Sequence, residues 1–264
     1  MSRLFVDMSL KVGEEILLPK ESAHYLLNVL RLRVGTSVTL FNGQGGEYVA
    51  HLIATTKKAA TLQLIEYNAI ERESNLQLTL VQAISRPEHF SYTLQKAVEL
   101  GVQRIVPVIT ERSPPVDKSK ISKREQHWRK IIINACEQCG RNRLPQLHEV
   151  LSLNAWLSQP QSSLSLVLSP TGNKSLLEFQ LESKAQALNE LESKALALNE
   201  IKRDFITVLI GAEGGLTETE IEQAKTVGYQ EIRFGTRILR TETAATAILA
   251  VCQALWGDLG MCMK

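Results

Sequence analysis

The stretch VLIGAEGGLTETEIEQA, residues 208–224, decides the fold of the second half of the chain. An apolar, strand-like run stops at Gly211, and the capping-box pattern TETE predicts a helix from Thr217 to Val227. Glycines that follow a strand let a ligand approach the backbone closely. Because Glu213 lies among these glycines, the ligand must tolerate a carboxylate at that point.

Strands and helices alternate around this stretch, which predicts a mostly parallel α/β sheet. The expected strands are residues 76–84, 104–109, 164–169, 205–210 and 231–235. The expected helices are residues 85–100, 123–139, 217–227 and 241–255. The first of these helices begins at a second capping-box pattern, SRPE at 85–88.

The first part of the chain has a different pattern. Polar and apolar residues alternate in 36–41, 46–54 and 59–67, as in strands with one buried face, and 22–32 has helical spacing. This predicts a small β-barrel with a helix at its rim. The polar residues 68–75 form the expected connector, so we predict two domains, 1–72 and 73–264.

Composition narrows the class of protein. The 264 residues carry a net charge of +2, and their apolar share of 44% is ordinary for a globular protein. Asp7 and Lys11 interrupt the region where a signal peptide needs apolar residues, and no apolar run is long enough to span a membrane. We therefore expect a cytoplasmic protein without a membrane segment.

Cysteine and histidine spacing gives no metal signature. Cys136 and Cys139 form a single C-x-x-C without a second pair at zinc-finger spacing, and the five histidines show no H-E-x-x-H. Two thiols one helical turn apart are the simpler interpretation, and we expect no metal.

Positive charge is concentrated in residues 112–143, which contain nine Lys or Arg against three acidic residues. Such a stretch is suited to RNA or is a solvated helix face. Residues 181–190 and 191–200 are nearly identical decapeptides, LESKAQALNE and LESKALALNE, which we interpret as a tandem duplication in a surface excursion.

The glycine loop lacks both common phosphate-binding patterns. No lysine follows it as in G-x-x-x-x-G-K-[ST], and the G-x-G-x-x-G spacing is absent. A carboxylate would also repel a phosphate. S-adenosylmethionine (SAM) fits better because it has an adenosine, no phosphate and a cationic sulfonium. The alternative is that Glu213 faces the positive end of the helix that begins at Thr217.

Three separated motifs together resemble a known family. GAEGGLTETEI at 211–221, FGTRILRTETAATAIL at 234–249 and ACEQCGRNRLP at 135–145 are similar to the RsmE-type 16S rRNA (uracil-N3)-methyltransferases of the SPOUT superfamily. Residues 24–48 resemble the RNA-binding domain of that family. One departure is Ala212, where the family usually has proline.

The resemblance implies a PUA-like barrel followed by a SPOUT domain with a C-terminal trefoil knot, and a homodimer that binds SAM in the knot. It implies that backbone groups of Ile238 and Leu239 contact the adenine, and that Leu168 and Ile238 sandwich it. The expected cofactor-binding residues are Leu168, Ile210, Gly211, Glu213, Gly214, Gly215, Phe234, Gly235, Ile238, Leu239, Thr243 and Ala244.

The implied reaction methylates N3 of a uridine in 16S rRNA, within the 30S subunit. Arg240 is the candidate for stabilising the uracil anion, and Glu242 for accepting its proton or holding Arg240. The candidate RNA contacts are Arg3, Arg31, Arg33, Arg124, Arg129, Arg141 and Arg143. The alternatives are a SPOUT enzyme acting on a ribose 2′-hydroxyl or on tRNA, and a non-catalytic ribosome-assembly factor.

Overall fold

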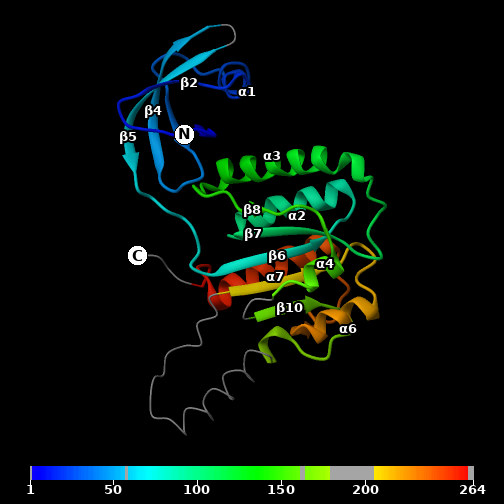
Figure 1. Cartoon of the computed structure of the whole chain (residues 1–264). Helices are drawn as coiled ribbons and strands as arrows, with labels where there is room; N and C mark the ends of the chain where they lie inside the picture. The colour runs from blue at the N-terminus through cyan, green and yellow to red at the C-terminus, as the bar shows by residue number, and fades with distance from the viewer. Residues whose placement is uncertain (1, 57–58, 161–163, 179–204, 261–264) are drawn as a thin grey trace, which may run out of the picture. The chain divides into compact units, whose positions relative to one another are not determined.

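The computed structural model describes residues 2–56, 59–160, 164–178 and 205–260 (Figure 1). The chain forms two compact units, residues 1–73 with 132–144, and residues 74–131 with 145–264. The predicted division placed all residues after 72 in the second domain, so segment 132–144 differs from it. The duplicated decapeptides at 181–200 lie outside the described residues.

The first unit is built on one five-stranded sheet. Its strands are β1 (Ser2–Phe5), β2 (Glu15–Leu17), β3 (Ser37–Phe41), β4 (Glu47–Thr55) and β5 (Ala60–Asn68), in the order β1-β3-β4-β5-β2. The pair β1–β3 is parallel and the other pairs are antiparallel. Leu40, Leu52 and Leu62 point into one core, which confirms the period-two pattern of these strands.

The helical pattern at 22–32 is confirmed only in its first part. Helix α1 (Lys20–His24) continues into a π-helical turn, η1 (Tyr25–Val29). Ala23 and Leu26 are fully buried and join the core of the sheet. The burial of these two side chains anchors the helix.

Segment 132–144 belongs to the first unit because its polar groups bond to that unit. Arg141 is 4% exposed and its Nε donates to Glu73 Oε1 at 2.9 Å. Asn142 Nδ2 donates to the Ile70 carbonyl at 2.7 Å, and Asn142 Oδ1 accepts from Arg3 Nη2 at 2.7 Å. The motif CGRNR therefore holds the connector in place. Burial of Arg141 against Glu73 corrects the prediction that this arginine contacts RNA.

Two neighbouring arginines test this structural role. Replacing Arg141 with alanine leaves Glu73 buried without its partner, so we expect unfolding to become easier by about 3–5 kcal/mol. The matched variant Arg143→Ala breaks a pair with Glu71 whose arginine side chain is 55% exposed, so about 0–1 kcal/mol is expected. Denaturant titration of both variants measures the difference; equal midpoints would contradict it.

The second unit contains a parallel sheet of seven strands, two more than predicted. Its order is β12-β10-β11-β6-β7-β8, and β9 pairs with β7 beside β8. The strands are β6 (Gln77–Ala83), β7 (Arg104–Ile109), β8 (Gln146–Leu147), β9 (Leu151–Ser152), β10 (Leu164–Leu168), β11 (Phe205–Ile210) and β12 (Tyr229–Ile232). The two unpredicted strands, β8 and β9, have two residues each, which is too short for a periodic pattern. Strand β12 begins two residues earlier than expected and ends three residues earlier.

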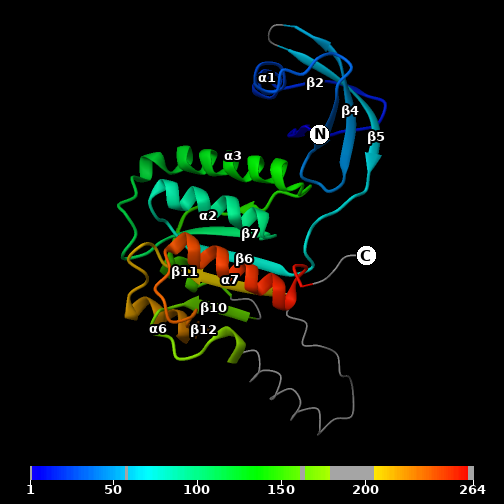
Figure 2. The same cartoon turned by 180° about the vertical axis from the view of Figure 1, so that it is seen from behind.

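Helices cover both faces of this sheet. They are α2 (Pro87–Glu99), η2 (Lys118–Lys120), α3 (Ile121–Cys139), α4 (Leu153–Leu157), α6 (Glu218–Thr226) and α7 (Thr241–Trp256). Val81 and Ala83 of β6 pack in one core with α4 and α6. The next residue between them, Gln82, points to the opposite face and bonds to Thr241 of α7. Figure 2 shows α7 and α2 lying side by side on that face. No described helix is both long and apolar enough to cross a membrane.

The described cysteines have no disulfide partner and differ in burial. Burial raises the pKa of the Cys136 and Cys252 thiols to about 12. At pH 8 the thiolate fraction of each is then on the order of one in ten thousand. We expect iodoacetamide to modify the half-buried Cys139 first and to leave the other two unmodified in the folded chain. Peptide mass mapping checks this, and rapid labelling of Cys252 would contradict it.

Candidate active site

The larger of two cavities in the second unit has a volume of about 450 Å³. It lies where β10, β11 and β12 end, at what we call the carboxyl edge of the sheet. Its walls are residues 168–170, 210–215 and 233–239, with Thr241 and Ala244 from the start of α7. In parallel α/β sheets, ligands bind outside the carboxyl ends of the strands.

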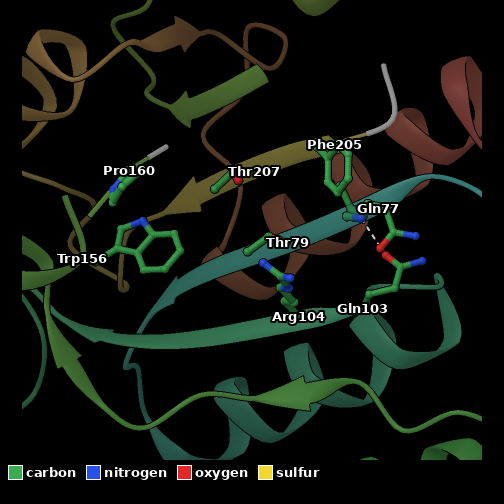
Figure 3. Close-up of a pocket in the computed structure, with 9 residues that line it drawn as sticks. Gln77, Thr79, Gln103, Arg104, Trp156, Pro160, Phe205 and Thr207 are labelled. Carbon is green, nitrogen blue, oxygen red and sulfur yellow. Dashed lines mark hydrogen bonds between the residues drawn. The ribbon is translucent and has the colours of Figure 1, made fainter. Parts of the chain in front are cut away.

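A second cavity lies at the opposite edge of the same sheet and measures about 80 Å³ (Figure 3). Its lining includes Gln77, Arg104 and Phe205, which are the first residues of β6, β7 and β11. Trp156 closes one side in Figure 3 and its Nε1 donates to Tyr229 Oη at 2.8 Å. Its small volume and its place at the starts of the strands make it the weaker candidate.

Strand register brings the three predicted loops together at the carboxyl edge. Leu168 pairs with Ile232, so the loops after β10 and β12 leave the sheet side by side. Val167 pairs with Leu209, which places Gly211 and the loop after β11 next to both. Parallel strands must end at the same edge, and the expected convergence of the loops follows from this topology.

Loop 211–215 folds back on itself and leaves no room at its first glycine. A Cβ on Gly211 would lie 2.5 Å from the carbonyl carbon of Gly215, whose φ is +72°. Arg112, from the segment after β7, donates from Nη1 to the Gly214 carbonyl at 2.7 Å and to the Leu216 carbonyl at 3.2 Å. The loop is therefore closed by its own backbone and held from outside by one guanidinium.

Glu213 has a partner that the sequence did not indicate. Its Oε1 accepts from the backbone N–H of Arg86 at 2.9 Å, at the start of α2. The capping box predicted at 85–88 is wrong, because Arg86 is the N-cap residue and makes no side-chain capping bond. The interpretation that Glu213 faces the helix beginning at Thr217 is likewise replaced, since its carboxylate caps α2 instead. That helix has its own capping box, as predicted.

The Gly211 carbonyl is held by two buried side chains. Thr241 Oγ1 donates to it at 2.7 Å, and Gln82 Nε2 lies at 3.3 Å from it and 3.0 Å from Thr241 Oγ1. Both residues, like Arg112, were missed by the sequence analysis. Gln82 carries a usable signal, since an amide within an otherwise apolar strand must find buried partners.

The predicted cofactor-binding residues are gathered around the 450 Å³ cavity with one exception. Thr243 is exposed and does not contribute to the lining, because it lies on a different side of α7 from Thr241 and Ala244. Ile238 is 89% exposed although it is apolar, and it lies in the cavity wall. An apolar side chain in that position gives the cavity a surface for a flat apolar ring.

The two predicted catalytic residues begin α7 beside this cavity. Arg240 is the exposed N-cap residue of α7, and Glu242 lies in its first turn. Within the described residues, Glu242 Oε1 is 2.9 Å from Nδ1 of His89 in α2, and no ion pair joins it to Arg240. The structure therefore favours the view that Glu242 is held by His89 over the view that it holds Arg240.

The environment keeps Glu242 ionised. Burial acts to raise the pKa of Glu242, but its own backbone N–H, the contact with His89 and the charges of His89 and Arg240 outweigh it and lower the pKa. The first turn of a helix also favours a negative charge. A carboxylate is therefore present near the mouth of the cavity at neutral pH.

The candidate RNA contacts differ in availability. Arg31, Arg33 and Arg129 are exposed, and Arg124 is half-buried. Arg3, by contrast, is engaged by Glu47, and Arg143 lies 2.9 Å from Glu71. In the described part of the chain, no group of three histidine, cysteine or acidic side chains is arranged to hold a metal ion.

Comparison with known proteins places the chain in a class and then in a family. A parallel sheet with a ligand cavity at its carboxyl edge is typical of cofactor-dependent α/β enzymes. Residues 72–253 match a family described as an RNA methyltransferase domain, and residues 18–65 match an RNA methyltransferase PUA domain. The chain belongs to this family of RNA methyltransferases.

Individual relatives cover nearly the whole chain. Ribosomal RNA small subunit methyltransferase E of Buchnera aphidicola (subsp. Schizaphis graminum) is 30% identical over 97% of both chains. The enzyme of the same name from Neisseria gonorrhoeae, solved with S-adenosyl methionine, is 35% identical with a TM-score of 0.81 over 98% of this chain and 99% of that one. A Legionella pneumophila methyltransferase in complex with SAM is 34% identical with a TM-score of 0.85 over 97% and 98%.

Proposed function

We propose that the chain transfers the methyl group of SAM to N3 of a uridine in 16S rRNA. The observation that carries this proposal is the cavity at the carboxyl edge, which is walled by three loops and has the Glu213 carboxylate in its lining. Two similar enzymes, one from Legionella pneumophila and one from Neisseria gonorrhoeae, were solved with this cofactor. The relatives named ribosomal RNA small subunit methyltransferase E support the 16S rRNA substrate.

The residues of the cavity fit SAM. The close-packed Gly211 and the glycines that follow allow the cofactor to approach the backbone. Leu168 and Ile238 supply apolar surface for the adenine, and Glu213 suits a cationic ligand better than a phosphate. When bound, SAM supplies an electrophilic methyl group on its sulfonium.

The chain's own residues have to deal with the uracil proton and its charge. N3 of uracil is protonated, so it becomes a nucleophile only after it loses that proton. The exposed guanidinium of Arg240 would donate to the uracil oxygens on which the negative charge collects, and Glu242 would accept the proton. Holding the target base in line with the methyl group contributes further, which requires the base to leave its stack.

The RNA-binding surface forms part of the same proposal. Arg31, Arg33, Arg124 and Arg129 would bind phosphates of the 30S subunit, which is assembled in the cytoplasm. The PUA-like first unit supports an RNA partner. Salt dependence of 30S binding tests this surface, because each lost phosphate contact flattens the dependence on salt concentration.

A homodimer and a trefoil knot are also proposed, and both are supported by the family resemblance. The knot is further supported by Thr241, which begins α7 between the loops that wall the cavity. Sedimentation measures the mass of the assembly. Pulling the chain from both ends measures the knot, since a tightened knot leaves the extended chain shorter than its 264 residues allow.

The decisive experiment incubates the purified chain with 30S subunits and methyl-labelled SAM and then maps the modified nucleotide by mass spectrometry. A single uridine in 16S rRNA that carries the label on N3 is the expected result. Label on a ribose 2′-oxygen or on added tRNA would assign a different substrate. SAM binding without transfer to any RNA would favour a ribosome-assembly factor.

A further inference from the structure

The start of α7 contains a carboxylate that is fixed at one oxygen and free at the other. Oε1 of Glu242 lies 2.9 Å from Nδ1 of His89, whereas Oε2 is buried and has no hydrogen-bond partner among the described residues. A buried polar atom without a partner is rare in folded proteins and needs an explanation. An acceptor oxygen kept for a substrate proton is such an explanation.

His89 belongs to a second helix that is anchored to the cavity loop. It lies in the first turn of α2, whose starting N–H, from Arg86, is bonded to Glu213 of loop 211–215. Its Nε2 lies 3.9 Å from Glu88, whose side chain is 68% exposed. The starts of α2 and α7 and the glycine loop therefore meet, and the imidazole bridges the two helices.

We propose that His89 is a positioning residue for methyl transfer, holding Glu242 through Oε1 so that Oε2 takes the proton of uracil N3. The inference rests on the proposed function. Nothing in the sequence pattern singles out His89, which is 153 positions from Glu242 along the chain and was not among the expected site residues.

The step balances as follows. Oε2 of Glu242 bonds to the N3 proton and becomes part of a neutral carboxyl group, while the electron pair of the N–H bond stays on N3. N3 then bonds to the methyl carbon, and the carbon–sulfur bond breaks with its electrons on sulfur, which turns the sulfonium into a neutral thioether. The carboxyl group returns its proton to water after the product leaves.

The orientation of the carboxylate matters because only one of its oxygens is free. Without His89, the Glu242 side chain can rotate about its bonds, and the acceptor oxygen spends less time at the reacting proton. Displacing a reacting group by about 1 Å costs up to roughly a hundredfold in rate. Binding of SAM at the glycine loop does not use this carboxylate, since Glu242 does not line the cavity.

Three variants test the inference. His89→Ala removes the contact with Oε1, and we expect kcat for 30S methylation to fall by roughly tenfold to a hundredfold, with KM for 30S and Kd for SAM unchanged. His89→Asn places an amide N–H near the position of Nδ1 and should recover most of the lost rate. His127→Ala, at an exposed histidine of α3, is the matched control and should retain wild-type kcat.

A modified substrate separates positioning from general damage. In 30S subunits reconstituted with 5-fluorouridine-containing 16S rRNA, the electron-withdrawing fluorine makes N3–H more acidic, so less help is needed to remove the proton. The difference between His89→Ala and wild type should shrink with this substrate, which loss of folding would not produce.

The possible results separate the two proposals. Equal kcat for wild type and His89→Ala, a loss confined to KM or Kd, or a loss unchanged on the fluorinated substrate would each overturn the role of His89 alone. Absence of N3 methylation by the wild-type chain would overturn the proposed function and this inference together.

Discussion

Replacing Arg240 with alanine is expected to lower kcat for 30S methylation by about 100- to 1000-fold, the effect of removing one donor from a developing anion. The guanidinium is exposed at the N-cap of α7, beside the cavity, and within the described residues it forms no ion pair with Glu242. It is thus available to the uracil oxygens. Single-turnover kinetics with saturating SAM measure the chemical step directly.

The control for this variant is Arg104→Ala. Arg104 is an exposed arginine in the same unit, at the opposite edge of the sheet, so its loss should leave the rate of methyl transfer unchanged. Calorimetry should give the same SAM affinity for Arg240→Ala and wild type. If Arg240→Ala retained more than about a tenth of the wild-type rate, stabilisation of the anion by this residue would be rejected.

Replacing Gly211 with alanine is expected to weaken SAM binding by about 10- to 100-fold. The added Cβ would lie 2.5 Å from the Gly215 carbonyl carbon and 2.7 Å from the Leu216 nitrogen. Both are backbone atoms that cannot rotate away, so the loop itself must move. Its displacement should cost about 1–3 kcal/mol and open the wall of the cavity.

Gly214→Ala is the matched variant in the same loop. Its Cβ would meet the Arg112 side chain at 3.3 Å, and a flexible side chain can yield. We therefore expect a much smaller loss of SAM affinity, measured by calorimetry under identical conditions. Equal affinities for the two alanine variants would show that packing of Gly211 against Gly215 does not shape the binding site.

Local pattern was sufficient for the regular elements of the fold. Strands β6, β10 and β11 and helices α6 and α7 lie where alternation, apolar runs and capping signals predicted them. The capping box at Thr217 formed as read, because its two partners, Thr217 and Glu220, are three residues apart and meet in any helix that starts there. Short strands such as β8 and β9 carry no comparable signal.

The sequence by itself determined which loops wall the cavity, because parallel strands that end together bring the segments after Leu168, Ile210 and Ile232 to one edge. Only the tertiary structure decided which charged groups meet. Glu213 caps α2 in place of the local pattern, and Arg141 is buried against Glu73 instead of facing RNA. Such partners are far apart along the chain, and spacing in one sequence does not encode which acceptor a donor reaches once the core has packed.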